Sequence, residues 1–226
     1  RFEEIKHASL MGIQIPGEPT LDMTQLQKWK GSVVSRLTGG VRTLLKGNKV
    51  EMMTGEARFV APRTLEVQTS EGIKRVEADH IVIATGSRPI EIPGFSFKDP
   101  PILDSTKGLD LPAVPKRLAV IGGGYIGLEL GGMYAKLGTS VTVIEAMDQI
   151  LTGFDPEVVK LIERKLKKDK VTIQLKAKAQ SWEQGEDGVV LHYETPEGPQ
   201  TLNTDYILVA VGRRPNTDKI GLENTG

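Results

Sequence analysis

The 226-residue sequence contains no cysteine at all. That absence excludes disulfides, thiolate catalysis and sulfur-ligated metals within these residues, and we expect no metal site. A hydrophobic content of 38% suits a soluble globular protein, and the length leaves room for one large or two small domains.

The sequence also lacks an excess of either charge, since Lys plus Arg and Asp plus Glu both total 29. A balanced chain has no electrostatic footprint for nucleic acid or an anionic membrane, so neither partner is expected. It has no apolar run near the roughly 20 residues that span a bilayer, and no basic-then-apolar leader. We therefore expect a soluble, cytoplasmic protein.

The two ends of the sequence look incomplete. Position 1 is Arg rather than Met, and residues 1–8 start within a helical pattern that has no capping residue ahead of it. Residues 221–226 stop in a loop. We expect the sequence to be an excerpt of a longer polypeptide.

What is present is a glycine motif that follows an apolar strand pattern at residues 118–121. Gly122, Gly124 and Gly127 fit the spacing G-x-G-x-x-G, and helical spacing resumes after them. Gly122 allows a tight turn, Gly124 allows the backbone to approach a pyrophosphate, and Gly127 allows the helix to lie against the sheet. The N–H groups at the helix start then face the phosphates.

A second apolar strand pattern ends in Glu145, 18 residues beyond Gly127. An acid at this place accepts hydrogen bonds from a ribose 2′-hydroxyl and repels a 2′-phosphate, which favours NAD over NADP. The alternative is a glycine-rich turn without a ligand. The strand before the turn, the helix after it and the acid at the expected distance favour the dinucleotide site.

Hydrophobic periodicity predicts an order of elements along the chain. A long helix with one buried face is expected after the N-cap Asp22, and a second N-cap is expected at Asp155. The expected helices span 23–46, 125–137 and 156–168. The expected strands span 50–53, 57–60, 64–68, 74–77, 80–84, 117–121, 141–145, 171–175, 177–182, 188–194 and 200–202, and a last apolar strand begins at residue 206.

Residues 80–89 and 206–215 share one pattern: an apolar strand, Ala, a variable residue, Gly, a variable residue, Arg and Pro. Each copy follows a β-meander. We interpret this repeat as two nucleotide-binding domains of related construction in tandem. The predicted fold class is α/β, with an NAD-binding Rossmann-like domain with a β-meander at 111–226 and the remaining part of a similar FAD-binding domain at 1–110.

These motifs together resemble the dihydrolipoamide dehydrogenases, which are flavin-dependent pyridine nucleotide-disulfide oxidoreductases. The resemblance covers the whole sequence. Its motifs are Gly39-Gly40, the segment 55–59, the segment 84–89, Asp104-Ser105-Thr106, the glycine turn through Glu129, and the segment 211–216. It implies that the parent enzyme oxidises dihydrolipoyl groups through a disulfide and FAD, with hydride transfer to NAD.

The resemblance also implies cofactor contacts. By this resemblance, Thr85, Gly86 and Ser87 contact FAD, together with the backbone at Ala57. The NAD pyrophosphate binds to the glycine turn, which comprises Gly122, Gly123, Gly124, Tyr125, Ile126 and Gly127. Glu145 binds the adenosine ribose, and Ala179 and Gly212 line the rest of the NAD site.

Tyr125 of this turn and Glu129 beyond it also have mechanistic roles by the same resemblance. The residue matching Tyr125 covers the flavin until nicotinamide displaces it, and the residue matching Glu129 lies beside the nicotinamide. The non-catalytic alternatives are that Tyr125 is an ordinary packing residue and that Glu129 only compensates the helix dipole. None of His7, His80 and His192 can replace the family's catalytic histidine, and His80 and His192 are interpreted as structural.

Several parts of the family pattern are missing from the sequence: the redox-active cysteines, the N-terminal FAD motif and the C-terminal dimerisation domain. We therefore expect this chain alone to be inactive. The implied partners belong to the parent: a 2-oxo acid dehydrogenase complex with its lipoyl-bearing acyltransferase, and a second subunit of a homodimer. Two alternatives remain open, an NADH oxidase or ferredoxin reductase-like flavoprotein, and a non-catalytic nucleotide-binding module.

Overall fold

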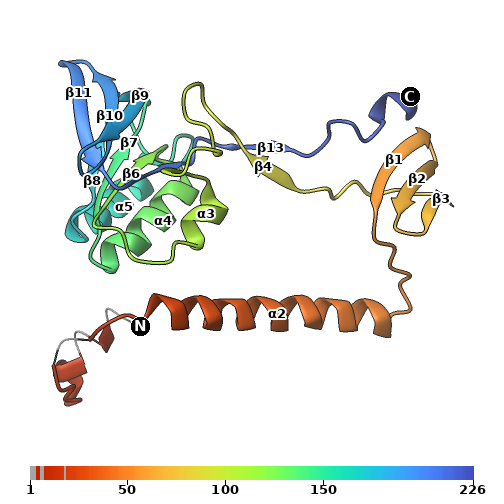
Figure 1. The fold of residues 1–226 in the computed structure, drawn as a ribbon, viewed down its shortest axis with the longest axis horizontal. Coiled ribbons are helices and arrows are strands. Elements are labelled where there is room, and N and C mark those ends of the chain that lie inside the picture. The colour runs from red at the N-terminus through yellow and green to blue at the C-terminus, as the bar shows by residue number, and fades with distance from the viewer. Residues whose placement is uncertain (1–3, 6–7, 18) are drawn as a thin grey trace. The chain divides into compact units, whose positions relative to one another are not determined.

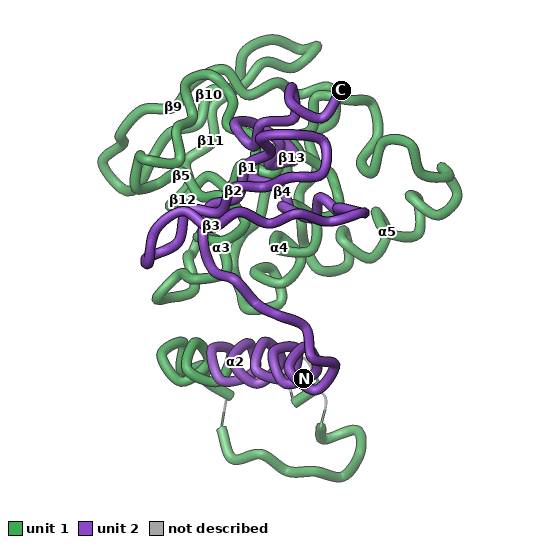
Figure 2. Tube along the Cα trace, turned by 90° about the vertical axis from the view of Figure 1, so that its right-hand side faces the viewer, with its two compact units in different colours: residues 1–29, 89–212 green, residues 30–88, 213–226 purple. Residues whose placement is uncertain are grey.

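The computed structural model describes residues 4–5, 8–17 and 19–226 (Figure 1). Most of the helix predicted over 1–8 lies outside these residues, although residues 4–5 are helical and a 3-10 turn, η1, spans Ala8–Met11. The chain divides into two compact units, residues 1–29 with 89–212 and residues 30–88 with 213–226 (Figure 2). Each unit is described by itself.

The larger unit is built on a parallel sheet with the strand order β5-β12-β6-β7-β8. These strands span Ile102–Leu103 (β5), Tyr206–Val209 (β12), Arg117–Ile121 (β6), Ser140–Ile144 (β7) and Thr172–Gln174 (β8). The helices of this unit span Ser105–Leu109 (α3), Tyr125–Lys136 (α4) and Pro156–Lys168 (α5). The predicted α/β class is confirmed.

Both faces of this sheet are covered. Side chains alternate along each strand, so both faces carry apolar residues that need to be buried. Leu118 and Val120 of β6 belong to a core shared with α4 and α5. Ala119 and Ile121 of the same strand point to the other face and join a second core. Figure 1 shows the helices and the β9 to β11 meander on opposite sides of the sheet.

The second core is closed by a three-stranded antiparallel meander in the order β11-β10-β9. Its strands span Lys178–Gly185 (β9), Gly188–Thr195 (β10) and Gly198–Thr204 (β11). Val189, Leu191 and Tyr193 alternate along β10 and are buried against the sheet. The meander predicted over 177–202 is confirmed.

Helix α5 starts as its sequence predicts. The Asp155 carboxylate accepts a hydrogen bond from the Glu157 N–H at 2.8 Å, and Pro156 occupies the first helical position. Val159 and Leu166 are its buried residues, while Lys165, Lys167 and Lys168 lie in its last turn, next to the negative end of the helix dipole.

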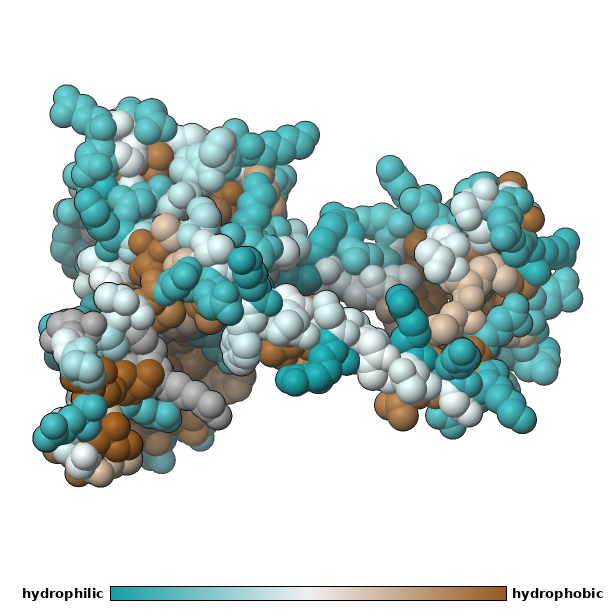
Figure 3. Space-filling view, turned by 60° about the horizontal axis from the view of Figure 1, so that its bottom comes forward, coloured by the Kyte–Doolittle hydropathy of each residue, from teal (hydrophilic) through white to brown (hydrophobic). Residues whose placement is uncertain are grey.

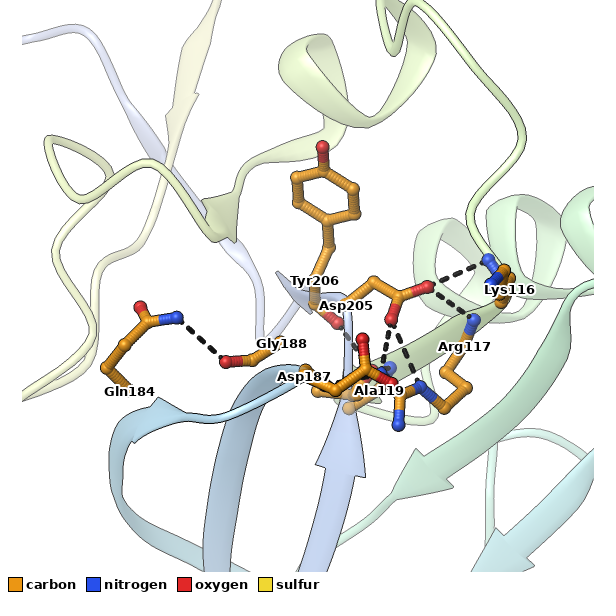
Figure 4. A network of polar contacts seen from close by, with 9 residues as sticks. Lys116, Arg117, Ala119, Gln184, Asp187, Gly188, Asp205 and Tyr206 are labelled. Carbon is orange, nitrogen blue, oxygen red and sulfur yellow. Dashed lines mark hydrogen bonds and ion pairs between the residues drawn. The ribbon is translucent and has the colours of Figure 1, made fainter.

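The start of β6 is joined to the meander by a polar network around Arg117 (Figure 4). The Arg117 guanidinium donates to Asp205 Oδ1 from Nη2 at 2.7 Å and from Nε at 3.0 Å, and to the Asp187 carbonyl at 2.6 Å. Asp205 Oδ2 accepts the backbone N–H groups of Lys116 and Arg117. Burial raises the pKa of Asp205, but these donated hydrogen bonds outweigh it and hold that pKa below its usual value.

The smaller unit contains an antiparallel sheet in the order β1-β2-β3. These strands span Glu56–Ala61 (β1), Thr64–Thr69 (β2) and Gly72–Glu77 (β3). The C-terminal segment packs on β1: the Phe59 N–H donates to the Ile220 carbonyl at 2.7 Å, and Asn224 donates to the Phe59 carbonyl at 3.0 Å. That segment includes the 3-10 turn η2, Leu222–Asn224.

Two predicted strands do not form. Residues 50–54 have no regular secondary structure, and neither do residues 80–86. The apolar pattern at 80–84 predicts a buried strand, but Val82 is 87% exposed. Among the described residues no strand pairs with this segment, and an unpaired strand leaves its backbone groups without a ladder partner.

The long helix α2 spans Met23–Gly47 and begins where predicted, with Asp22 accepting from the Gln25 N–H at 3.0 Å. The prediction that one face is buried is wrong in this structure: none of its residues is buried, and Leu44 is 67% exposed. The hydrophobic side chains on the face drawn in Figure 3 form patches among hydrophilic ones. None of the helices that the structure describes is long and apolar enough to cross a membrane.

A test of the Arg117 network follows from its geometry. We expect Asp205→Asn to lower the midpoint of thermal unfolding by about 3–6 °C at neutral pH, because charged hydrogen bonds are lost in a partly buried place. Asp187→Asn is the matched control, since the Asp187 side chain is 93% exposed, and we expect a change below about 1 °C.

The pH dependence gives a second readout of the same pair. A carboxyl with a lowered folded-state pKa stabilises the fold above its ordinary pKa and loses that contribution as pH falls through the folded-state value. The difference between wild type and Asp205→Asn should therefore shrink below about pH 4. A difference that stays constant down to pH 2 contradicts the role assigned to Asp205.

Candidate dinucleotide site

The glycine turn lies where β6 ends. Gly122 has a φ of +108°, in the left-handed region that L side chains rarely adopt. A Cβ at this position would lie 2.6 Å from the Ala210 carbonyl oxygen at the end of β12, and the Gly122 N–H donates to the Ile144 carbonyl of β7 at 2.9 Å. The turn is therefore held between the two strands that flank β6.

Gly127 serves the close approach of helix and turn. A Cβ on Gly127 would lie 2.3 Å from the Gly122 carbonyl oxygen and 3.0 Å from Val120 Cγ1. Only a residue without a side chain allows α4 to approach the sheet this closely, and this is the packing predicted for the third glycine.

Gly124 is the N-cap of α4, and no side chain among the described residues makes a capping hydrogen bond to this helix. Tyr125, Ile126 and Gly127 are its first three residues, and the N–H groups of a helix's first turn have no partner within the helix. The first of its N–H groups bonded back to the turn is that of Leu128, which donates to the Gly124 carbonyl at 3.0 Å. This end of α4 thus offers donors and the positive end of the dipole.

Glu145 follows β7 and reaches the glycine turn. Its Oε2 accepts the Gly123 N–H at 2.6 Å, and its Oε1 accepts the Met147 N–H at 2.8 Å. The Glu145 backbone is also fixed, because its N–H donates to the Gln174 carbonyl and its carbonyl accepts from Ala177, both at 2.8 Å. The carboxylate therefore has one orientation, beside the turn.

A cavity of about 590 Å³ opens between the carboxyl ends of β6 and β7 and the start of β9. Three residues predicted for the NAD site line it: Gly122, Glu145 and Ala179. The other lining residues are Ile92, Pro93, Ile121, Ile144, Ala146, Met147, Ala177, Lys178, Gln180 and Val211. Its walls are mainly apolar, with one carboxylate and one ammonium group among them.

Gly212, Tyr125 and Glu129, also predicted for the NAD site, do not line this cavity. Glu129 instead lines a second cavity, which is formed by residues of α4 and of α5. Gly212 directly follows Val211 of the wall, has a φ of +140°, and accepts the Ile90 N–H at 3.1 Å. Tyr125, 61% exposed, and the exposed Glu129 lie one turn apart on α4. Residues at i and i+4 share one helix face.

The residues predicted to contact FAD belong to the other unit. Ala57 is exposed on β1, where it pairs with Val67. Thr85 Oγ1 donates to the Asn216 carbonyl at 2.7 Å, and the Asn216 N–H donates to the Gly86 carbonyl at 3.0 Å. These bonds join the first copy of the internal repeat to the residue that directly follows the second copy.

The same pairing continues into a short ribbon formed by β4, Ser87–Pro89, and β13, Arg213–Pro215. The Arg213 guanidinium donates to Ser87 Oγ at 2.8 Å and to the Ser87 carbonyl at 2.5 Å. Of the three histidines, His192 has its Nε2 3.3 Å from Glu183 Oε1, His80 lies in the irregular segment 80–86, and His7 lies outside the described residues.

Met147, Lys178 and Gln180 are cavity residues that the sequence analysis missed. Met147 could have been predicted from the sequence, because it follows the carboxyl end of β7, and ligands of open α/β sheets bind at the carboxyl ends of the strands. Ile92 and Pro93 gave no signal, since they come from an irregular segment far from the motif in sequence.

Comparisons with known proteins agree with this geometry. A family model described as "Pyridine nucleotide-disulphide oxidoreductase" matches residues 3–226. The chain is 49% identical to the Dihydrolipoyl dehydrogenase of Geobacillus stearothermophilus over 226 residues, which are 100% of this chain and 48% of that protein. The chain thus spans about half the length of the curated relatives it matches.

Two solved structures are also similar. The flavoprotein disulfide reductase RclA from Escherichia coli matches with a TM-score of 0.67 and 33% identity, over 76% of this chain and 38% of that one. LpdA from Mycobacterium tuberculosis matches over 100% of this chain and 49% of its own, with a TM-score of 0.87 and 24% identity. The LpdA match supports the fold.

The packing of the turn predicts that alanine substitutions at two glycines, Gly122 and Gly132, change the free energy of unfolding by very different amounts. We expect Gly122→Ala to lower the free energy of unfolding by about 2 kcal/mol or more, because it combines a left-handed φ with a backbone clash. Gly132→Ala is the control in α4, where the new Cβ would meet only Leu166 Cδ2 at 3.7 Å. That change should be neutral or stabilising by about 0.5–1 kcal/mol. Equal effects in urea unfolding contradict the geometry of the turn.

Proposed function

The chain belongs to the pyridine nucleotide-disulphide oxidoreductase family, and from this premise we propose that it holds the NAD-binding portion of a dihydrolipoyl dehydrogenase. The family consists of FAD-dependent oxidoreductases that use NAD(H). We assign the NAD-binding role to residues 111–226 and part of the FAD-binding role to residues 1–110, with the sites themselves in the larger and the smaller compact unit respectively.

One observation carries this proposal: a carboxylate at the end of β7 is held beside the glycine turn of β6, at the edge of a 590 Å³ cavity. A dinucleotide presents a pyrophosphate and a ribose diol, and these groups need N–H donors and an acceptor a few ångströms apart. The α4 N-terminus supplies the donors and Glu145 supplies the acceptor.

The residues present fit NAD. Gly122 and Gly124 leave the turn without side chains on the path to the α4 N–H groups, and a Cβ at Gly124 would meet nothing within 4 Å. The apolar walls suit an adenine ring, and the small side chain of Ala179 leaves room for it at one wall. Glu145 orients the adenosine ribose and repels a 2′-phosphate.

Tyr125 and Glu129 are proposed for the nicotinamide end on the strength of the resemblance. Both are exposed on α4, one turn apart, on the side where the helix begins. Tyr125 would cover the flavin until nicotinamide displaces it, and Glu129 would lie beside the nicotinamide. When bound, FAD and NAD supply the hydride-transfer chemistry, and the chain supplies position and electrostatics.

For FAD we propose contacts at Ala57, Thr85, Gly86 and Ser87. Gly86, with a φ of +72°, places a side-chain-free turn between two hydroxyl residues, which allows a ligand to approach the backbone. The redox-active disulfide, a cytoplasmic location, a dimeric parent and its service to a 2-oxo acid dehydrogenase complex are part of the same proposal. They rest on the family resemblance.

A first test is nucleotide preference. We expect this chain to bind NADH at least about tenfold more tightly than NADPH, because the 2′-phosphate would lie against the Glu145 carboxylate, and about 1.4 kcal/mol corresponds to that factor. Calorimetric titration of both nucleotides at one ionic strength measures it. Equal affinities contradict the role of Glu145.

A second test is catalytic. We expect no oxidation of dihydrolipoamide by this chain with NAD and added FAD, because the sequence has no thiol to pass electrons from the substrate. A full-length relative serves as the positive control in the same absorbance assay at 340 nm. Turnover above the protein-free rate would refute the assignment of the disulfide to other residues.

A further inference from the structure

Both backbone polar groups of Gly123 are hydrogen-bonded by one segment, residues 145–151. Its N–H donates to Glu145 Oε2 at 2.6 Å, and its carbonyl accepts the Leu151 N–H at 2.8 Å. The middle position of the G-x-G motif, which is variable by its definition, is thus fixed in the fold by contacts of its own.

Packing restricts the same position. A Cβ on Gly123 would lie 2.8 Å from Ile150 Cγ2 and 3.0 Å from Glu145 Oε2. Ile150 is fully buried, so it has little freedom to move away. The segment 145–151 therefore contacts Gly123 through two hydrogen bonds and one apolar side chain.

The conformation of this segment is itself unusual. Leu151 has a φ of +51°, in the left-handed region where a leucine is strained. Such a conformation persists only where surrounding contacts fix it. Here it directs the Leu151 N–H to the Gly123 carbonyl.

We propose that segment 145–151 is a brace that positions the glycine turn before the dinucleotide binds, with Glu145 as its main positioning residue. Glu145 then has two roles, one toward the turn and one toward the ribose. An ionised carboxylate has about four acceptor positions, so two remain for a ribose diol after the Gly123 and Met147 N–H groups are bonded. The consequence for nucleotide affinity rests on the proposed function, but the brace itself does not.

The first experiment needs no ligand. Hydrogen exchange of the Gly123 amide is followed by NMR in the free chain, in wild type and in Glu145→Met, which keeps the length of the side chain but has no acceptor oxygen. We expect exchange at Gly123 to become about tenfold faster, because a charged hydrogen bond is lost. Glu145→Gln keeps one acceptor oxygen and should give an intermediate rate.

Glu197→Met is the matched control, since Glu197 is exposed in the turn between β10 and β11. It should leave Gly123 exchange unchanged. The amide of Val120, inside β6, reports whether a variant has loosened the whole sheet. Unchanged Gly123 exchange in both Glu145 variants overturns the brace.

The second experiment separates the brace from direct ribose contact. ADP and 2′,3′-dideoxy-ADP are titrated into wild type and Glu145→Gln. A residue that acts only on the ribose hydroxyls leaves the dideoxy affinity unchanged, and loss of its negative charge should even tighten pyrophosphate binding. The brace predicts the opposite, a loss of about threefold or more for the dideoxy ligand.

The two proposals fail in different ways. Wild type that binds neither ADP nor NADH refutes the proposed function, while the exchange measurement still decides the brace. Dideoxy-ADP affinity that is unchanged or higher in Glu145→Gln refutes a role of the brace in binding.

Discussion

The parallel sheet of the larger unit can exist only if both of its faces are covered. Each strand carries apolar side chains on alternate sides, and a parallel pair needs a crossover that brings a helix or a longer segment back over one face. Helices α4 and α5 cover one side, and the β9 to β11 meander covers the other. With both faces covered, the loops that follow the carboxyl ends of the strands are left free to form a ligand site.

The position of the site follows from this arrangement. Strands β6 and β7 are neighbours in register, with Ile121 opposite Ile144, so the residues after each strand lie side by side. Gly122 turns away over the end of β12, and Glu145 continues past the end of β7 toward that turn. The glycine motif and the acid, which are far apart in the sequence, are thus brought together because they follow two adjacent strands.

The sequence predicted elements well where the local pattern and the tertiary partner agree. Residues 117–121 form a strand because β12 and β7 pair with it on both sides. Residues 80–84 have an equally apolar pattern but remain irregular, since a strand is defined by its neighbours and none of the described strands pairs with it. Helix α2 shows the converse, because capping and propensity form a helix even where its apolar face stays exposed.

For the site, sequence reasoning identified the groups but not their bonds. Glu145 was predicted as an acceptor for a ribose, and a spacing rule cannot reveal that its carboxylate already accepts two backbone N–H groups. A further bond to the turn, from the Leu151 N–H to the Gly123 carbonyl, comes from a leucine with a left-handed φ, a conformation that propensity disfavours and only packing can fix. A loop held in this way loses less conformational freedom when a ligand binds, so affinity comes at a lower entropic cost. If both proposals hold, the acid that selects the nucleotide also keeps the turn ordered, and cofactor preference and loop rigidity cannot be changed independently at this position.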